Sequence, residues 1–233
     1  MIRYFSGLLL FLTFCAALAA PVPQMKPFET GWDKPVDPDG DCKFRRDKDV
    51  LTIELPGKDH DLGIERNRMN APRLLRDVEG DFIVEVRVSG EFRPSSDSTA
   101  AERLAFVGAG LLLMNGDKTY VRLERAALRN GDIVRTYANW ELRENGQWVL
   151  IGNAGIKPLK GKETFLRLER QGDKILGSIS EDSKEWQTLA PIEVKLPAKI
   201  KIGVAACTTS SEPFAPRFDR FQLKQKSEKK TAK

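Results

Sequence analysis

The chain has 233 residues, and its 38 lysines and arginines outweigh 33 acidic residues to give a formal net charge of +5. Over most of the sequence the basic residues alternate with acidic ones and are not gathered on one element, which argues against a nucleic-acid-binding protein. Part of the excess lies in residues 224–233, a Lys-rich stretch that predicts a solvated, disordered tail.

The first 19 residues predict a secretory signal peptide. Arg3 supplies the positive charge, residues 8–18 form the apolar stretch, and Ala17-Leu18-Ala19 provides the small residues of a cleavage site. The apolar stretch is short for a membrane span, and Phe14 is too bulky to precede a lipidated Cys15. We therefore expect cleavage after Ala19 and a secreted or periplasmic protein with no membrane contact after cleavage.

Residues 31–223 predict one all-β domain, preceded by a linker over residues 20–30. Alternating apolar and polar residues mark short strands with turn signals between them, and no segment keeps a helical period over three turns. Ten or more short strands with hairpin-length connections predict an antiparallel two-sheet jelly-roll sandwich. The expected strands cover residues 51–55, 82–88, 106–114, 119–125, 134–143, 148–151, 164–170, 175–180, 186–189, 200–207 and 218–223.

Residues 59–77 do not alternate and are rich in arginine, with Asn70-Ala71-Pro72 in the middle. We predict a long loop that contains one helical turn. Long loops on sandwiches are either decoration or functional segments. If this one is functional, its arginines between Arg66 and Arg76 would suit an acidic protein partner.

A seven-residue word occurs twice, as TYVRLER at residues 119–125 and as TFLRLER at residues 164–170. With a period of two, Val121 and Leu123 point to one face of the first copy, and Leu166 and Leu168 do so in the second. These leucines and valine predict the core face. The opposite face of each copy carries an aromatic residue, an arginine and a glutamate.

That polar face is the candidate ligand surface. Tyrosines and phenylalanine offer apolar platforms, while arginine, glutamate and asparagine offer hydrogen bonds, the mixture that the faces and hydroxyls of a sugar require. The alternative is a structural lattice of cross-strand ion pairs on the same face. Both interpretations treat the two copies as parts of one surface. The predicted ligand-binding residues are Tyr120, Arg122, Glu124, Tyr137, Asn139, Phe165, Arg167 and Glu169.

The tryptophans divide differently. Trp140 falls on the core face of residues 134–143, and Trp186 closes a hairpin, so both are predicted to be packing residues. Trp32 and Trp148 stay unassigned.

Signal cleavage would leave two cysteines, Cys42 and Cys207, in an oxidising compartment. The apolar residues of 199–207 alternate so that Cys207 shares its face with Lys199 and Lys201, away from the core. Strand parity thus argues against a disulfide between Cys42 and Cys207. The disulfide could still form if a β-bulge turned either side chain toward the core.

His60 is the only histidine, and without a recognisable serine or cysteine nucleophile nearby it is predicted to be a solvated loop residue. Asp37, Asp39 and Asp41 begin like a calcium-binding loop, but Lys48 stands where a bidentate glutamate should close it. A turn is therefore favoured, and a weak Ca²⁺ site is the alternative. No cofactor or other metal is expected.

The order of these motifs resembles a domain family of unknown function in the concanavalin A-like lectin/glucanase superfamily, named for a regulator of enolase and related to the C-terminal domain of β-xylosidases. The resemblance covers residues 31–223 and implies a jelly roll with a sheet that often faces carbohydrate. Ser183 departs from the glycine usual in the family's hairpin, but serine also favours turns. The motifs are GDFIVEVRV (80–88), GAGLLL (108–113), VRLER (121–125), LRLER (166–170), SEDSKEW (180–186) and GVAACTTSS (203–211).

The sequence favours a non-catalytic binding module for a carbohydrate or glycoconjugate. A protein-interaction or structural module is the first alternative, and a glycoside hydrolase is the second. Hydrolysis is disfavoured because the Glu-x-Asp-x-Glu strand of the superfamily's retaining glucanases is missing from the sequence. Glu124 and Glu169 each lie beside arginines, which favour an ionised carboxylate over a general acid. No catalytic residue is therefore assigned.

Overall fold

The computed structural model describes residue 28, residues 31–150 and residues 158–225. The predicted signal peptide and residues 226–233 of the predicted tail lie outside these ranges, so neither prediction is tested. The first two residues of the predicted tail belong to the last strand, which continues to Gln225.

The described residues form sixteen strands and one short 3₁₀ helix, η1. Within those residues, no helix is long and apolar enough to cross a membrane. In chain order the elements are β1 (Lys43–Asp47), β2 (Val50–Glu54), β3 (Leu62–Gly63), η1 (Ile64–Arg66), β4 (Arg68–Met69), β5 (Arg73–Glu79), β6 (Phe82–Ser89), β7 (Phe106–Asn115), β8 (Thr119–Asn130), β9 (Ile133–Glu144), β10 (Gln147–Leu150), β11 (Glu163–Gln171), β12 (Lys174–Ser180), β13 (Gln187–Thr188), β14 (Ile192–Glu193), β15 (Lys199–Thr208) and β16 (Arg217–Gln225).

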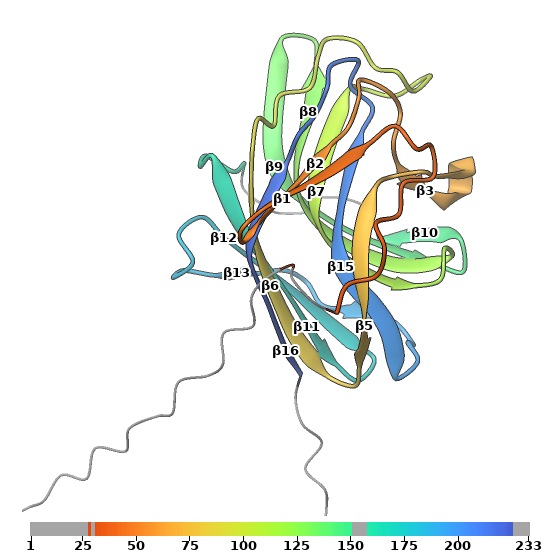
Figure 1. The fold of residues 1–233 in the computed structure, drawn as a ribbon, viewed down its shortest axis with the longest axis vertical. Coiled ribbons are helices and arrows are strands. Elements are labelled where there is room, and N and C mark those ends of the chain that lie inside the picture. The colour runs from red at the N-terminus through yellow and green to blue at the C-terminus, as the bar shows by residue number, and fades with distance from the viewer. Residues whose placement is uncertain (1–27, 29–30, 151–157, 226–233) are drawn as a thin grey trace, which may run out of the picture.

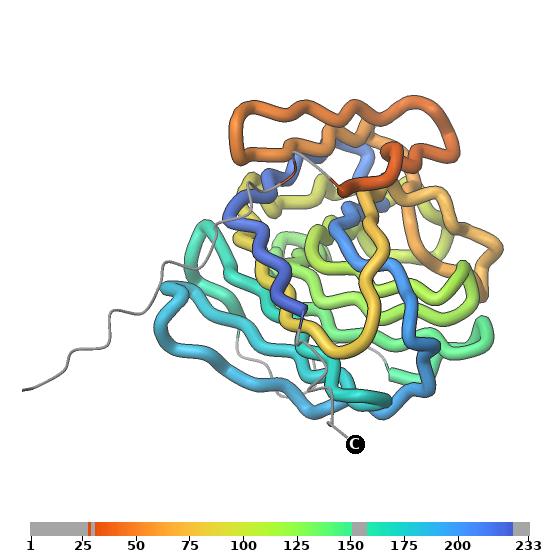
Figure 2. The backbone as a smooth tube through the Cα atoms, turned by 60° about the horizontal axis from the view of Figure 1, so that its bottom comes forward, coloured from red at the N-terminus to blue at the C-terminus, as the bar shows by residue number. Residues whose placement is uncertain are grey.

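Two antiparallel sheets pack face to face, as the sequence predicted (Figure 1). The six-stranded sheet has the order β10-β9-β8-β7-β15-β5, and the eight-stranded sheet has the order β1-β2-β16-β6-β11-β12-β13, with β14 paired to β12. In Figure 2 the hairpin of β1 and β2 lies across one end of the molecule, and β16 runs beside β6.

The core between the sheets follows the alternation of the strands. On β6 every second residue, from Phe82 to Val88, is apolar and buried, and each intervening residue is partly exposed, as a strand with one face in the core requires. Val121, Leu123, Leu166 and Leu168 all lie in this core, so the predicted faces of the repeated word are confirmed. Trp140 lies there too, with its indole N–H donating to the Ala190 carbonyl at 2.9 Å.

The two copies of the word belong to different sheets. β8 pairs with β7 and β9 in the six-stranded sheet, whereas β11 pairs with β6 and β12 in the eight-stranded sheet. Since each copy turns its leucines inward, their polar faces point away from each other on opposite sides of the sandwich. The expectation of one shared surface is therefore wrong, because alternation sets the face of a strand and long-range pairing sets its sheet.

The last arginine of each word closes an end of the sandwich. Arg125 donates to the Thr164 hydroxyl at 2.8 Å and to the Gly161 carbonyl at 2.7 Å. Arg170 donates to the carbonyls of Leu196 and Pro197 at 3.0 and 2.8 Å. Both guanidinium groups thus satisfy loop carbonyls that strand pairing leaves without donors.

Residues 59–77 are more ordered than the predicted loop. The helical turn is confirmed as η1, and a short hairpin of β3 and β4 flanks it. Residues 73–79, however, form β5 at the edge of the six-stranded sheet. The sequence hid this strand because Leu74 packs in the core while its neighbour Leu75 packs on the outer side, which breaks the alternation.

Candidate functional site

The face of the six-stranded sheet that points away from the core, here called the outer face, is partly roofed by residues 59–72. Leu62 and Ala71 from this segment pack with Leu112, Tyr120 and Ala126 of the sheet in a second apolar cluster. The Tyr120 hydroxyl donates to the Leu62 carbonyl at 2.7 Å. The roof therefore converts a sheet surface into an interior layer.

The roof buries most of the predicted ligand residues on this sheet. Tyr120 is 0% exposed, Glu124 1%, Asn139 2% and Arg122 4%, while Tyr137 stays half-buried. Ligand binding by these side chains stays a prediction. In the structure they contact each other and the roof.

Arg122 is the centre of a buried charged network. Its guanidinium donates to Glu141 on β9 through both Nε, at 3.1 Å, and Nη2. It also contacts Asp61 Oδ1 at 3.4 Å and Cys207 Sγ at 3.2 Å, and its Nε lies 3.8 Å from Glu124 Oε2. One cation thus faces three carboxylates in a region without solvent.

Asp61 ties the roof to the sheet. Its carboxylate accepts hydrogen bonds from Arg103 at 2.6 Å, from Arg66 at 3.0 Å and from the Leu62 amide at 2.8 Å, in addition to the contact with Arg122. Burial opposes ionisation, but the arginines outweigh it and lower the pKa of Asp61. This side chain is therefore a fixed anion under the roof.

Glu124 and Glu141 experience opposite environments. Burial raises the pKa of Glu124, with Arg122 offsetting it only partly, and its Oε1 has no hydrogen-bond partner. Burial acts on Glu141 too, but Arg122 and Arg143 outweigh it and lower the pKa. As the sequence predicts, the neighbouring Arg122 favours ionisation of Glu124, but complete burial outweighs it and leaves the pKa above its ordinary value. Two carboxyl groups with pKa values shifted in opposite directions are found in acid–base catalysis. Glu124, however, is too deeply buried to reach a substrate.

The tyrosines and Arg143 complete this layer. Burial raises the pKa of Tyr120 and of Tyr137 to about 12, so both phenols are neutral. Arg143 lies between two rings, 5.9 Å from the centroid of Tyr120 and 4.4 Å from that of Trp148. Trp148, which the sequence left unassigned, therefore covers the network at the β10 edge.

The polar face of the second copy lies on the other sheet, where Arg167 and Glu169 are partly exposed and Phe165 is buried. Arg167 donates to Glu85 at 2.8 Å, and its guanidinium lies 3.8 Å from the ring centroid of Trp186. Glu169 accepts from Gln171 at 2.8 Å, and Phe165 lies 5.6 Å from the Arg220 guanidinium. The structure therefore separates these three predicted residues from the five on the six-stranded sheet.

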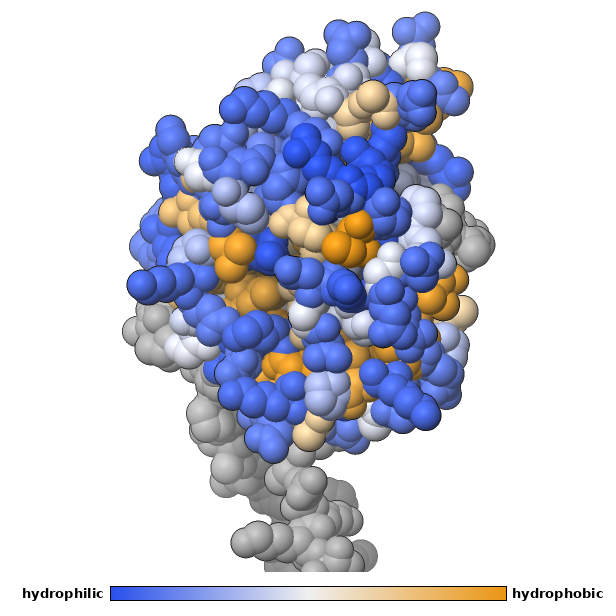
Figure 3. All heavy atoms as spheres, turned by 90° about the vertical axis from the view of Figure 1, so that its right-hand side faces the viewer, coloured by the Kyte–Doolittle hydropathy of each residue, from blue (hydrophilic) through white to orange (hydrophobic). Residues whose placement is uncertain are grey.

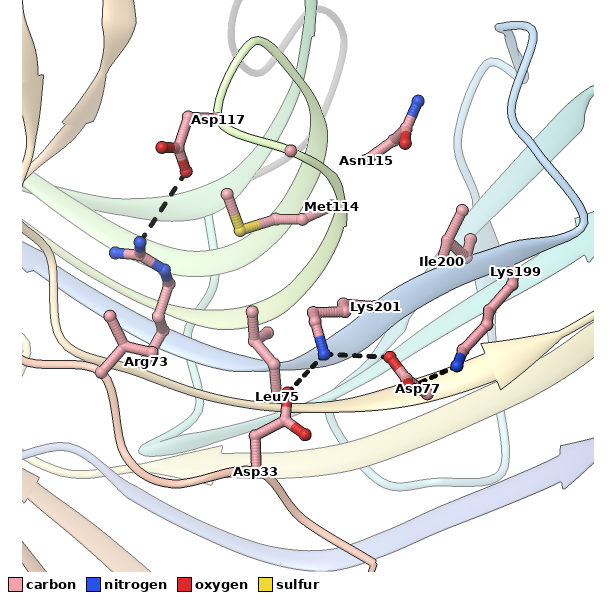
Figure 4. A pocket seen from close by; sticks show the side chains of 12 residues that line it. Asp33, Arg73, Leu75, Asp77, Met114, Asn115, Asp117, Lys199, Ile200 and Lys201 are labelled. Atoms are coloured by element: carbon pink, nitrogen blue, oxygen red, sulfur yellow. Dashed lines mark hydrogen bonds and ion pairs between the residues drawn. The ribbon is translucent and has the colours of Figure 1, made fainter.

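An open groove lies beyond the roof, at the end of the outer face formed by β5, β7 and β15 (Figure 4). It encloses about 480 Å³. Leu75 and Met114 form its floor and belong to the same apolar cluster as Tyr120, so the groove adjoins the buried layer. The side of the molecule that carries β3 and β10 is mainly hydrophilic, with small apolar patches between the polar side chains (Figure 3).

The rim of the groove consists of ion pairs. Lys201 Nζ bridges Asp33 at 2.6 Å and Asp77 at 2.9 Å, and Lys199 contacts the other Asp77 oxygen at 2.8 Å. Arg73, whose Nη1 donates to the Ala71 carbonyl at 3.0 Å, faces Asp117 at 3.9 Å. The bonds from both lysines lower the pKa of Asp77, so the rim carries charged donors and acceptors over an apolar floor.

The cysteines are free and the acidic turn is confirmed. Cys207 lies under the roof beside Arg122, on the face that parity predicted, while Cys42 lies far along the chain beside Asp41. Asp37 accepts from the amides of Gly40 and Cys42, which makes a turn. The prediction of a solvated histidine is wrong, because His60 is 0% exposed.

Comparison with known proteins supports the fold. Neither a protein-family model nor a curated protein sequence matches the chain. Among solved structures, a functionally unknown protein from Saccharomyces cerevisiae aligns with a TM-score of 0.62 at 16% identity, over 84% of this chain and 96% of that one. A xylan β-1,4-xylosidase from Bacillus halodurans aligns with a TM-score of 0.55 at 17% identity, over 89% of this chain and 42% of the xylosidase. The carbohydrate-binding module CBM66 from Bacillus subtilis aligns with a TM-score of 0.50 at 13% identity, over 84% and 96% of the two chains. The fold is therefore concanavalin A-like, and the chain corresponds to less than half of the xylosidase.

Sequence reasoning missed the groove and the roof. The sequence does not predict that Asp77 lies beside Lys199 and Lys201, because nothing in the spacing of these residues indicates that β5 pairs with β15. One signal was available. Strand parity alone predicts that both lysines lie on the outer face of β15.

Proposed function

We propose that this concanavalin A-like sandwich is a non-catalytic carbohydrate-binding module that holds its ligand in the groove at the end of the outer face. The observation that carries the proposal is the groove itself, an apolar floor beneath a rim of paired charges. A sugar ring has an apolar C–H face and a periphery of hydroxyls, which is the pattern that such a groove complements.

The rim suits hydroxyl recognition because its members are accessible yet held in place. The side chains of Lys201, Asp33 and Asp77 are each between 41% and 47% exposed, and each is fixed by at least one ion pair. A bridging lysine donates to hydroxyls and the flanking carboxylates accept from them, so little side-chain entropy is lost on binding.

Export and the closer family relationship are part of the same proposal. Cleavage after Ala19 would release the sandwich outside the cytoplasm, where polysaccharides occur, and N-terminal sequencing tests it. The domain family named for a regulator of enolase is the relationship that the sequence motifs suggest. The alignments with a xylosidase and with CBM66 support a carbohydrate role without identifying the glycan.

A glycan array followed by isothermal titration with xylan, glucan and polygalacturonate tests the proposal. We expect the parent protein to bind at least one glycan and Asp77→Asn to weaken that binding at least tenfold. Arg45→Gln is the matched control, because Arg45 forms an exposed ion pair with Glu54 on the other sheet. Unchanged affinity in Asp77→Asn would remove the groove as the site. Failure of the parent to bind any glycan would favour the protein-interaction alternative, for which the arginines of residues 66–76 are the candidate surface.

A further inference from the structure

Three metal-ligating side chains converge next to the first hairpin, away from the groove. A carboxylate oxygen of Asp41, the sulfur of Cys42 and a ring nitrogen of His60 all lie within 4.8 Å of one another. Asp41 Oδ1 is 2.8 Å from His60 Nε2 and 3.6 Å from Cys42 Sγ. Among the residues that the structure describes, this is the one group of three or more histidine, cysteine and acidic residues that could hold a metal ion.

Oxygen atoms surround both ring nitrogens of His60. Its Nδ1 lies 3.1 Å from the Lys58 carbonyl, and its Nε2 lies 2.8 Å from Asp41 Oδ1 and 3.9 Å from Asp39 Oδ2. A neutral imidazole has one N–H, so it can donate to only one of these oxygens. Both nitrogens of this fully buried ring thus face oxygen atoms, and a metal ion at Nε2 would contact the imidazole and the carboxylates together.

We propose that Asp41, Cys42 and His60 bind Zn²⁺, with Asp39 as the fourth ligand. The Lys58 carbonyl would fix the Nδ1–H tautomer and leave the Nε2 lone pair for the metal, the arrangement that metal-binding histidines usually show. The thiolate, imidazole and carboxylates form a mixed N, S and O set that Zn²⁺ accepts in tetrahedral geometry. Zn²⁺ would take the place of the Cys42 thiol proton.

The ligands are anchored independently of the metal. Residue 60 exchanges two backbone hydrogen bonds with Thr208, at 2.9 and 2.8 Å, so the histidine is attached to β15. The second oxygen of Asp41 accepts from Lys58 at 2.9 Å, and Asp39 Oδ2 accepts from Asn70 at 2.7 Å. The ion would therefore fasten the turn at residues 37–42 to the segment that begins the roof.

The same residues argue against the Ca²⁺ site considered from the sequence. Calcium takes six to eight oxygen ligands, whereas a thiol and an imidazole point into this cluster. Asp37 uses its oxygens on the Gly40 and Cys42 amides. The softer ion is the better match to this set of ligands.

Isothermal titration of the untagged protein with ZnCl₂, after treatment with EDTA, tests the site. We expect one Zn²⁺ per chain, with at least tenfold weaker binding in Cys42→Ala and in Asp41→Asn. Cys207→Ala is the matched control, because it removes the other free thiol and should leave zinc affinity unchanged. Co²⁺ added in place of Zn²⁺ should give a thiolate-to-metal charge-transfer band that Cys42→Ala abolishes.

Three outcomes would overturn the proposal. They are no binding by the parent, equal zinc affinity in parent and Asp41→Asn, and a charge-transfer band that depends on Cys207. Circular dichroism checks that each variant is folded before titration, and the nearly isosteric Asp41→Asn keeps the test valid if Cys42→Ala unfolds. Glycan binding is measured separately in the zinc-loaded and EDTA-treated protein, so failure of one site does not obscure the other.

Discussion

Arg122 and Arg167 occupy the same position in the two copies of one word, yet the structure predicts very different costs for replacing them with glutamine. Arg122 is buried and contacts Glu141, Glu124 and Asp61. Arg167 is about one-third exposed, with a side-chain exposure of 32%. An interpretation from sequence alone would treat both as surface ion pairs of similar value.

The magnitudes follow from burial. Removing one partner from a buried ion pair costs about 3–5 kcal/mol, because the remaining charges stay desolvated. A glutamine amide at residue 122 can still donate to Glu141, so we expect a loss near the lower limit, about 3 kcal/mol. Arg167→Gln loses a partly exposed pair with Glu85 and a cation–π contact with Trp186, each worth at most about 1 kcal/mol when exposed.

Urea unfolding followed by tryptophan fluorescence measures the difference. For a slope of about 2–3 kcal/mol per molar urea, Arg122→Gln should lower the midpoint by about 1–1.5 M and Arg167→Gln by less, at most about 0.7–1 M. Equal midpoints for the two variants would refute the reasoning. They would mean that the roof opens readily or that the network adds nothing beyond its desolvation cost.

Three further predictions concern the core, the buried acid and a close backbone approach. Leu123→Asp and Leu168→Asp should each prevent folding, since an unpaired charge in the core costs several kcal/mol, and native-like circular dichroism of either variant would contradict the assigned faces. The pKa of Glu124 in the folded protein lies above 4.5, its ordinary value in the unfolded chain. As the pH rises from the unfolded-state pKa to the folded-state pKa, the folded protein therefore loses stability at this residue. Glu124→Gln should therefore raise the melting temperature at pH 8, and the gain should disappear below about pH 4; a constant gain would exclude the ionisation. Gly110→Ala should destabilise the fold more than Gly131→Ala. A Cβ at residue 110 would lie 2.1 Å from the Leu123 carbonyl oxygen, whereas a Cβ at residue 131 would meet open space and be strained only by the φ of +58°. The reverse order of melting temperatures would contradict the close approach at residue 110.

The sequence predicted the local part of the fold and missed most of its long-range part. Alternation assigned Val121, Leu123, Leu166 and Leu168 to the core, because the period of a strand is imposed by backbone geometry. It could not tell which strands pair, so the two words were taken as one surface. Pairing depends on connections far apart in the chain, which a period of two does not record.

The candidate site failed to emerge for a related reason. A polar face is assumed to meet solvent, and nothing in the sequence of β8 indicates that residues 59–72 fold over it. The absence of a serine or cysteine nucleophile context predicts a solvated His60, yet backbone bonds with Thr208 hold the residue inside. The charged residues of the groove form no sequence motif, since β5, β15, the turn after β7 and the segment before β1 contribute them.

The position of β16 between β2 and β6 bears on how this protein is made. A ribosome synthesises β2 and β6 early and β16 after every other described strand, so the two parts of the eight-stranded sheet stay separate for most of translation. The nascent chain meanwhile presents the edge of β6 as an open template for strand addition, which is the kind of edge that promotes aggregation. Insertion of a late strand between two early ones is a long-range event with a high loop-closure cost, so this step should be slow. Until Arg217–Gln225 joins the sheet, β6 therefore keeps an unpaired edge that can accept a wrong strand.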